Sequence, residues 1–403
     1  AITEKAARIF RHQLKDKASA IEYLKNRGIS GETAQTFQIG YAQDDWSGLM
    51  NRFDFGEHDL LAQTGLTTHN DSGKVYDKFR HRLMFPIHDR RGRVIAFGGR
   101  ALEADQKPKY LNSPETPLFH KGNELYAFHV ARKHSDEKHI LVVEGYMDVV
   151  ALFDKGIKNA VATLGTATSA QHIQNLFKVW DKIVFCFDGD RAGRQAAEKA
   201  LYTALPQYLD HKTISFLFLP DGQDPDSFVL EFGADAFRTL AEQAKPLSQF
   251  LLESVSDGIA THTIDGQAQL FHKAQSPLSH LPTGAFRQMM MREVESMTQH
   301  HFNAQRNITP PKRTKEQAEE SGSPVKKILS LLINLPELCQ QIPSDLNLHI
   351  FNFKGVEIID RIVEICQSQP HIRTAALIEH FRNTSFFNHF APFSKLYDHL
   401  AND

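Results

Sequence analysis

Apolar segments that end in acidic residues are the feature that most constrains the fold of this chain. Three such segments, Ile140–Val143, Ile183–Phe187 and Ile214–Leu219, follow one another between residues 138 and 232. Each is short and apolar, as is typical of a strand buried on both faces of a parallel sheet. The acids that follow these segments are, in chain order, Glu144, Asp148, Asp188, Asp190, Asp224 and Asp226. The carboxyl ends of such strands open into one crevice, where ligands bind.

Carboxylates gathered in one crevice would repel one another unless a hard cation lay among them. A single Asp after a strand is usually a turn residue or a helix N-cap, and we assign Asp154 and Asp221 to that class. Asp188 and Asp190 differ, because alternate residues of an extended segment point the same way and can share a cation. This spacing recurs after the third strand, which favours a metal site. The ligands are all oxygens without nearby His or Cys pairs, which indicates Mg²⁺ or Mn²⁺ rather than zinc or copper.

Two further patterns bear on phosphate binding. Magnesium held by few carboxylates normally also takes substrate phosphate oxygens, as phosphoryl transfer requires. Gly145 and Gly189 would let a phosphate approach closely, although glycine also simply makes turns. The segment Leu164–Thr168 would offer backbone N–H groups to a phosphate at the start of the following helix. Loop structure alone explains that segment equally well.

Strand and helix patterns alternate from residue 138 to 232, and this rhythm predicts an α/β fold with a doubly wound parallel sheet. Before it, residues 1–40 are expected to be helical, with Ser30 as an N-cap candidate, and residues 83–97 to form a β-hairpin. Lys109–Pro114 is expected to be a turn-rich loop. After the sheet, Pro246–Phe302 predicts a small helical bundle with breaks at four residues, which are Gly258, Gly266, Pro277 and Gly284.

The expected organisation is therefore a series of domains. They are a basic α+β subdomain (1–137), a metal-binding α/β domain (138–232), a helical bundle (233–306), a polar linker (307–324) and a C-terminal helical domain (325–403). In the last domain, Lys327–Leu335 and Val356–Cys366 have the periodicity of amphipathic helices.

Charge is distributed unevenly along a chain whose net charge is only −2. Residues 74–133 contain 13 Lys and Arg against 6 Asp and Glu, whereas residues 134–230 contain 9 against 13. A basic block beside an acidic one suggests a polyanion that lies across both, and the alternative is a solvated basic face. No apolar run approaches the roughly 18 residues of a membrane span, and no secretory signal is evident. The three cysteines, Cys186, Cys339 and Cys366, are far apart in sequence, so we expect a cytoplasmic protein.

These motifs resemble a known family. Three segments resemble the signature of a Toprim domain, the metal-binding fold shared by primases and topoisomerases: Glu144-Gly-Tyr-Met-Asp148, Asp188-Gly-Asp190-Arg-Ala-Gly193 and Asp224-Pro-Asp226. The segments around them resemble the bacterial replicative DNA primases, and they are Phe85-Pro-Ile87, Gly92–Arg100, Pro108–Pro114 and Phe119–Gly122. The resemblance runs from about Tyr23 to Leu240 and continues more weakly to the end of the chain.

The resemblance implies a nucleotidyltransferase that synthesises short RNA primers from ribonucleoside triphosphates on single-stranded DNA, without a pre-existing 3′ end. By motif position, the implied metal ligands are Glu144, Asp188, Asp190, Asp224 and Asp226, with Asp148 as a ligand or a supporting acid; Glu144, Asp188 and Asp190 would be catalytic. The implied template- and nucleotide-binding residues are Arg27, Arg82, Arg100, Lys109 and Lys121. For Arg27, a solvated helix end is an equal alternative. A replicative helicase is an implied partner, and a single-stranded DNA-binding protein is a further candidate.

Two features depart from the family pattern. Bacterial primases carry an N-terminal Zn²⁺-binding module, and this chain starts downstream of it and lacks its Cys/His cluster, so initiation at preferred sequences is in doubt. The family also ends in a helicase-docking helical hairpin, and the chain stops before that hairpin would fit, so helicase binding is in doubt. We expect a fragment of a longer protein. The alternative functions are a Toprim topoisomerase or nuclease that cleaves DNA, and a non-catalytic Toprim DNA clamp.

Overall fold

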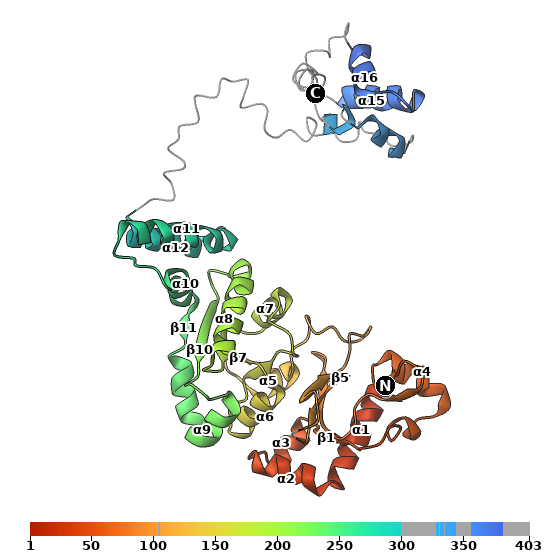
Figure 1. The fold of residues 1–403 in the computed structure, drawn as a ribbon, viewed down its shortest axis with the longest axis vertical. Helices are drawn as coiled ribbons and strands as arrows, with labels where there is room; N and C mark the ends of the chain where they lie inside the picture. Colours follow the sequence, from red (N-terminus) through yellow and green to blue (C-terminus); the bar gives the residue numbers. More distant parts are fainter. Residues whose placement is uncertain (104, 300–327, 330, 334, 344–355, 382–403) are drawn as a thin grey trace. The chain divides into compact units, whose positions relative to one another are not determined.

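The computed structural model describes residues 1–403 except 104, 300–327, 330, 334, 344–355 and 382–403 (Figure 1). The chain divides into two compact units, residues 1–302 and 303–403. All the acids and cations to which the sequence analysis assigns a role lie in the first unit. The predicted linker, 307–324, lies outside the described residues.

The N-terminal part of the first unit is an α+β layer. Its helices are α1 (Ile2–Lys15), α2 (Ala18–Asn26), α3 (Gly31–Thr36), α4 (His58–Gln63) and α5 (Phe128–His134). An antiparallel sheet has the order β1-β4-β5-β6, and its strands are β1 (Gly40–Ala42), β4 (Arg82–His88), β5 (Val94–Ala101) and β6 (Tyr110–Asn112). A separate hairpin pairs β2 (Thr67–His69) with β3 (Val75–Asp77).

Two local predictions for this layer are confirmed and one is wrong. The predicted hairpin is β4 and β5, and Ser30 caps α3 because its Oγ accepts a hydrogen bond from Thr33 N at 3.1 Å. Residues 110–112 were expected to be part of a loop, but they form the edge strand β6. The prolines and polar residues around this short strand hide its signal, and pairing with β5 determines its conformation.

A second sheet has the order β11-β10-β9-β7-β8, with β7 to β10 parallel. Its strands are β7 (His139–Val143), β8 (Ala160–Ala162), β9 (Lys182–Phe187), β10 (Thr213–Phe218) and β11 (Lys245–Pro246). The helices along it are α6 (Tyr146–Asp154), α7 (Ala170–Phe177), α8 (Arg191–Ala204) and α9 (Pro225–Glu242).

Both faces of this sheet are buried. In β7, Leu141 and Val143 pack into the core that α6 and α9 cover. Ile140 and Val142 point to the opposite face and pack with α7 and α8. Because successive strand residues alternate between faces, an all-apolar strand needs helices on both sides. The predicted α/β class with a doubly wound parallel sheet is confirmed.

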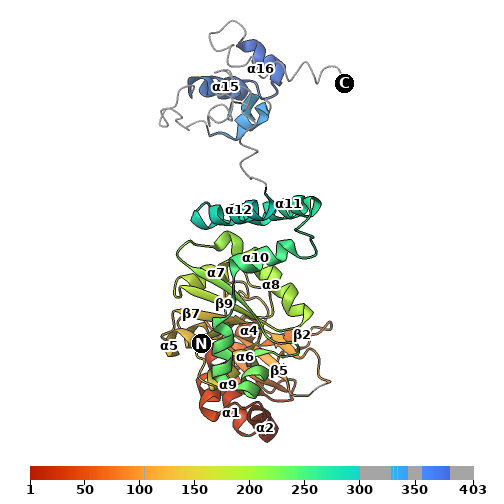
Figure 2. The same cartoon turned by 90° about the vertical axis from the view of Figure 1, so that its left-hand side faces the viewer.

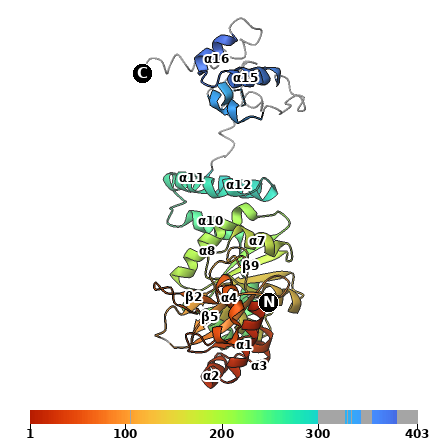
Figure 3. The ribbon, with the colours of Figure 1, turned by 90° about the vertical axis from the view of Figure 1, so that its right-hand side faces the viewer.

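Three helices follow the sheet: α10 (Leu247–Ser256), α11 (Ile264–His280) and α12 (Ala285–Thr298). Figures 2 and 3 show α11 and α12 side by side, next to α10. The predicted breaks at Gly266 and Pro277 are wrong, because both residues lie within α11. Thr263 caps the helix start through a 3.0 Å hydrogen bond from Gly266 N, and Pro277 is buried near the helix end. Burial of the helix face outweighs the intrinsic cost of these residues.

The second unit contains a 3₁₀-helix (Pro336–Gln341) and the helices α15 (Val356–Ser368) and α16 (Thr374–His380). The predicted helix over Val356–Cys366 is confirmed, and the described positions within Lys327–Leu335 are mostly helical. Cys339 and Cys366 are free cysteines of one apolar core, although 27 positions separate them. Among the described residues of both units, no helix is long and apolar enough to cross a membrane.

Candidate active site

The crevice of the doubly wound sheet lies between β7 and β9. The chain leaves β7 toward β8 on one side, and it leaves β9 toward β10 on the other. This change of direction makes the carboxyl ends of β7 and β9 the topological switch point, where open α/β sheets bind ligands. Glu144 follows β7 and Asp188 follows β9, so the two carboxylates flank the switch point.

Glu144 and Asp188 are the carboxylates with the least support from their neighbours. Neither side chain makes a hydrogen bond or ion pair within the part of the chain that the structure describes. Partial burial, followed by the charge of Asp190, raises the pKa of Glu144. Partial burial and the charges of nearby acids, Glu144 first, raise the pKa of Asp188 to about 6. These carboxyls therefore repel each other, and a cation between them would relieve the repulsion.

Three more acids combine a local structural role with a place in the same electrostatic cluster. Asp190 caps α8 by accepting a 2.7 Å hydrogen bond from Gly193 N, and Asp224 caps α9 in the same way through Ser227 N at 2.7 Å. Asp148 accepts a 3.0 Å hydrogen bond from Gly145 N. Burial, followed by the charges of Asp224, Asp188 and Asp226, raises the pKa of Asp148 well above its ordinary value. Asp190 and Asp224 therefore cap helices and also belong to the acidic cluster, so helix capping does not exclude a role in a metal site.

Asp226 has a different environment from the other acids. Its side chain is buried and forms an ion pair with Arg27, so that a predicted metal ligand contacts a predicted nucleic-acid-binding residue. The second carboxylate oxygen, Oδ1, is buried without a hydrogen-bond partner among the described residues. Burial raises the pKa of Asp226, and Arg27 opposes that shift. Asp226 thus links the end of α2 to the acidic crevice.

No three His, Cys, Asp or Glu side chains in the described residues are already arranged to hold a metal ion. The donors nevertheless suit a hard divalent cation. They are carboxylate oxygens, and two of the carboxylates, Glu144 and Asp188, have no protein partner among the described residues. The raised pKa values of these two groups reflect burial and repulsion by neighbouring acids. The residues therefore fit Mg²⁺ or Mn²⁺, and a bound ion would draw the carboxylates together.

Three of the predicted cations gather around two tyrosines beside this crevice. The Arg100 guanidinium lies 4.6 Å from the Tyr23 ring and donates a 3.2 Å hydrogen bond from Nε to the Tyr110 hydroxyl. Lys109 Nζ lies 5.9 Å from the Tyr110 ring, and Arg27 lies 5.7 Å from the Tyr23 ring. Stacking on aromatic faces holds the cationic groups in place. Lys109 is exposed and Arg27 is partly exposed, whereas Arg100 is buried.

The two remaining predicted cations lie elsewhere. Arg82 is buried, and its Nη1 reaches the carbonyls of Lys109 and Gly99 at 3.4 and 3.5 Å, so its visible role is to tie β4 to the segment before β6. Lys121 lies close enough to Lys78 to add to the burial that lowers the pKa of Lys78. The structure therefore brings Arg27 and Arg100 to Asp226, and it places Lys109 beside Tyr110. Among the described residues, no contact of Arg82 or Lys121 with the acids is seen.

The chain closely matches solved primase structures. A DNA primase domain from Pseudomonas aeruginosa is 47% identical, with a TM-score of 0.71, and the match covers 74% of this chain and 95% of that one. The chain belongs to the DNA primase family.

Other comparisons show how much of this chain, and of its relatives, is matched. A structure described as a DnaG primase catalytic domain bound to ssDNA is 44% identical, with a TM-score of 0.69, over 73% of this chain and 96% of that chain. The DNA primase of Haemophilus influenzae is 38% identical over all of this chain and 69% of its own length. That of Legionella pneumophila is 42% identical over 91% of this chain and 64% of its own length. The chain thus spans about 64% of the length of the Legionella primase and 69% of that of the Haemophilus primase.

Three family profiles match successive parts of this primase-family chain. They are the N-terminal domain of the DNA primase catalytic core (residues 9–132), the Toprim domain (138–215) and the DnaB-binding domain of the DNA primase DnaG (325–402). The predicted resemblance to Toprim-containing bacterial primases is confirmed. The last match falls on the region for which the sequence analysis left helicase binding in doubt.

An aromatic and cationic cluster was missed by the sequence analysis. Trp46 is 62% exposed, and its ring centroid lies 5.1 Å from that of Tyr76. The Arg80 guanidinium lies 4.2 Å from the Trp46 ring and 4.9 Å from the Tyr76 ring. Arg80 also contributes to lowering the pKa of Arg82, so this cluster adjoins the basic residues of β4. The available signal was Lys74–Arg80, where tyrosine and phenylalanine alternate with basic residues.

Packing explains one glycine that the sequence analysis related to phosphate. A Cβ on Gly189 would collide with the backbone of Leu219 and Pro220, so glycine is required where two loops of the crevice touch. Close backbone approach is thus a sufficient reason for this glycine.

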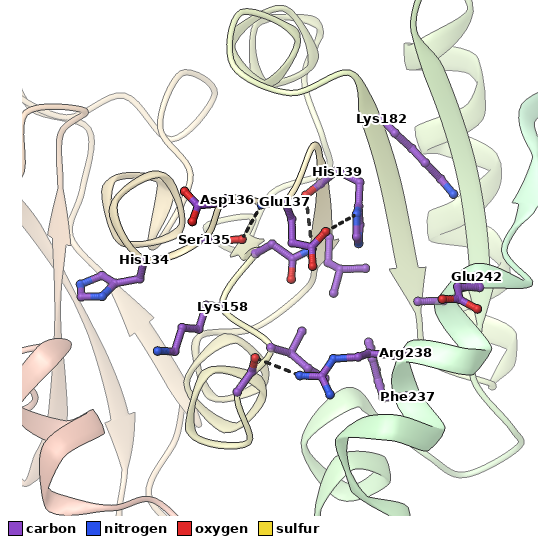
Figure 4. Close-up of a pocket in the computed structure, with 15 residues that line it drawn as sticks. His134, Ser135, Asp136, Glu137, His139, Lys158, Lys182, Phe237, Arg238 and Glu242 are labelled. Atoms are coloured by element: carbon purple, nitrogen blue, oxygen red, sulfur yellow. Dashed lines mark hydrogen bonds and ion pairs between the residues drawn. The ribbon is translucent and has the colours of Figure 1, made fainter.

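A pocket of about 700 Å³ lies at the opposite end of the sheet (Figure 4). His139 and Lys182, at the starts of β7 and β9, line it together with Arg238 and Glu242 of α9. Its lining mixes cations with acids, and His139 faces Glu137 at 3.5 Å. None of the carboxylates of the acidic crevice lines it, so it is separate from the candidate active site.

Proposed function

We propose that this chain carries the polymerising activity of a DNA primase: it joins ribonucleotides into short RNA primers on single-stranded DNA without a pre-existing 3′ end. The observation that carries the proposal is the pair of carboxylates Glu144 and Asp188 at the switch point of the sheet, which have no hydrogen-bond or ion-pair partner among the described residues. The stacked cations Arg27 and Arg100 lie near Asp226, another acid of the same cluster. Nucleotidyl transfer needs this combination, because it brings polyanionic substrates to a divalent cation.

The metal ligands we propose are Glu144 and Asp188, with Asp148, Asp190, Asp224 and Asp226 completing or supporting the site. A bound Mg²⁺ or Mn²⁺ would neutralise charge on the reacting phosphates and on the departing pyrophosphate. Zn²⁺ is expected only in an upstream module of the family. Asp190 and Asp224 each keep one oxygen on a helix start, which fixes the direction of the other. Arg27 holds Asp226 in place, so its loss would leave a buried carboxylate without a partner.

The template would lie along a basic face, whose cations are Arg27, Arg80, Arg100 and Lys109. Lys109 and Arg27, which are exposed and partly exposed, would bind backbone phosphates, and such contacts do not depend on base sequence. Arg100 is a proposed binding residue as well, although it is buried in the free protein. Trp46, with Arg80 stacked over it, offers a surface on which an unpaired base can stack. Arg82 and Lys121 remain proposed binding residues; Arg82 would act by positioning Lys109.

A primer-synthesis assay tests this proposal. The full chain is incubated with single-stranded DNA and labelled ribonucleoside triphosphates, with Mg²⁺, with Mn²⁺ or with a chelator. We expect RNA products of defined short lengths that need both template and divalent cation. Absence of products on several templates, in the presence of measurable DNA binding, would contradict the proposal. Supercoiled plasmid with Mg²⁺ provides the test of the alternative: nicking or relaxation would favour a topoisomerase or nuclease.

The C-terminal unit is proposed to dock a replicative helicase. The match of residues 325–402 to a DnaB-binding profile supports this partner. A single-stranded DNA-binding protein is a second proposed partner, and the cytoplasm is the proposed compartment. Calorimetric titration of the chain into purified replicative helicase would show saturable binding, and an absence of heat at micromolar concentrations would contradict it.

A further inference from the structure

A second cavity opens directly at the switch point. It has a volume of about 400 Å³, and both Glu144 and the last residues of β7 and β9 line it. Helix α8 closes one side, and the loop of residues 163–168 that follows β8 forms the rim. Glu144 thus belongs to two environments at once, because it is a member of the acidic cluster and stands in the lining of this cavity.

The lining of this cavity is mostly apolar with a few polar groups. Phe187 and the small side chains Ala192, Ala196 and Ala200 contribute the apolar part, and one alanine per helical turn leaves the space open. The polar groups are the side chains of Thr166, Thr168, Gln195 and Lys199. None of these four side chains makes a hydrogen bond or ion pair in the described residues, so all are available to a ligand. Small-molecule sites have this size and this balance of groups.

The rim loop is held in place from outside the cavity. Asn112 donates a 2.9 Å hydrogen bond from Nδ2 to the carbonyl of Leu164, and the Tyr146 hydroxyl donates to Asn112 Oδ1. Gly165 has φ of +72°, a conformation that favours glycine, and Ser169 caps the following helix α7. The threonine hydroxyls are therefore presented by a loop whose position is fixed before any ligand binds.

We propose that this cavity binds the ribose and base of a ribonucleoside triphosphate whose phosphates lie at Glu144, with the hydroxyls of Thr166 and Thr168 contacting the sugar. This inference rests on the proposed polymerising function. An apolar lining suits any of the four bases, which is required where the template and not the protein selects the base. Hydroxyl groups on the rim could hydrogen-bond the sugar hydroxyl that a ribose has and a deoxyribose lacks. A site built to bond a hydroxyl rejects a substrate without it.

Filling the cavity is the first test. Ala196→Leu puts a larger, helix-compatible side chain into the space, whereas Glu198→Leu adds the same side chain to an exposed position of α8 that does not line it. Equilibrium binding of ATP with Mg²⁺ to the full chain is measured by calorimetry, beside binding of single-stranded DNA. We expect Ala196→Leu to weaken ATP binding at least about tenfold and raise KM more than it lowers kcat, with DNA binding changed less than about twofold. Glu198→Leu should match the wild type.

The sugar assignment has its own test. Thr166→Val with Thr168→Val removes both hydroxyls at nearly constant volume, and we expect the ratio of ATP to dATP affinity to fall about fivefold to tenfold, as the loss of one or two hydrogen bonds implies. The Thr→Ser pair keeps the hydroxyls and should keep the ratio. An unchanged ratio in the valine variant would overturn the sugar assignment.

Results that overturn the cavity assignment are separate from those that overturn the function. If Ala196→Leu binds ATP as the wild type does while the wild type makes primers, the cavity does not hold the nucleotide and the function stands. If the wild type makes no primers but ATP binding depends on Ala196, the polymerising function fails and the nucleotide pocket stands. Should Ala196→Leu lose its circular dichroism signature, Ala192→Leu, at an exposed position of the same lining, replaces it with the same expected outcomes.

Discussion

The acidic crevice and the basic face differ in how their charged side chains are supported by neighbouring groups. At the crevice, Glu144 and Asp188 lie near other carboxylates and have no hydrogen-bond or ion-pair partner in the described part of the chain. The pKa of Asp188 is raised to about 6. On the basic face, the cations are already stacked on aromatic rings, as Arg100 is on Tyr23 at 4.6 Å and Arg80 on Trp46 at 4.2 Å. The crevice therefore holds repelling carboxylates that lack partners among the described residues, whereas each of these two cations has an aromatic partner.

We attribute this difference to the sizes of the two proposed ligands, a divalent ion and a nucleic acid. A small divalent ion must be surrounded by several oxygens at once, so its site concentrates like charge and is unstable without it. A nucleic acid spreads its charge over many phosphates, so its site can spread cations along a surface and support each one separately. Four substitutions test whether the two regions differ in this way.

Glu144→Gln should have the largest effect. Removing the charge at the crevice is expected to lower primer synthesis by about a thousandfold or more, since groups that stabilise reacting phosphates contribute on that order. DNA binding measured by fluorescence anisotropy should stay within about twofold, because the basic face is intact. Glu198→Gln, on the exposed side of α8, is the matched control. Primer synthesis near the wild-type rate in Glu144→Gln would remove this residue from the mechanism.

Trp46→Ala should weaken binding of single-stranded DNA about tenfold, because stacking of a base on an aromatic ring contributes about 1–3 kcal/mol. The chain has two tryptophans, of which Trp46 is 62% exposed and Trp180 is 3% exposed. DNA should therefore quench the fluorescence of the wild type and of Trp180→Phe, but not that of Trp46→Phe, which keeps a stacking ring. Equal quenching in both phenylalanine variants would show that bases do not stack at Trp46.

Lys109→Ala should weaken DNA binding more modestly, by about threefold to fivefold at moderate salt. The slope of log affinity against log salt concentration should fall in magnitude by about 1, as expected for the loss of one phosphate contact. Anisotropy titrations at several salt concentrations measure both quantities. An unchanged slope would mean that Lys109 does not contact phosphate.

Asp188→Asn should change the stability of the metal-free protein only slightly, and in the stabilising direction. The native carboxyl has a pKa of about 6, above its ordinary value of 3.8, so without metal the folded state binds more protons than the unfolded state between these values. Stability is therefore lost as pH rises from about 4 to about 6, and the neutral variant escapes that loss. We expect Tm in a chelator to rise by about 2–4 °C at pH 7.5 and hardly at all at pH 4.

Mg²⁺ gives the complementary result for Asp188. It should stabilise the wild type at pH 7.5, less so at pH 5.5 where the carboxyl is protonated, and should not stabilise Asp188→Asn. A variant that is less stable than the wild type in the chelator would show that the carboxylate is supported by the fold and not opposed by it.

Features that depend on neighbouring residues could be predicted from local sequence patterns. The burial of both faces of β7, and the acids after β7, β9 and β10, follow from local periodicity. The cap at Ser30 depends on a backbone N–H group within one helical turn. The hairpin of β4 and β5 is equally local. The same local rules failed at Pro277, where burial within α11 outweighs the intrinsic cost of proline.

Which distant side chains meet depends on the packing of separate elements, and sequence patterns did not predict it. The ion pair of Arg27 with Asp226 joins residues 199 positions apart, and the bridge from Asn112 to Leu164 spans 52. The stacking of Arg80 on Trp46 and the cavity beside Glu144 also depend on how separate elements pack. Periodicity indicates which face of an element is buried, but not which element covers it, and the site is built from the contacts between elements.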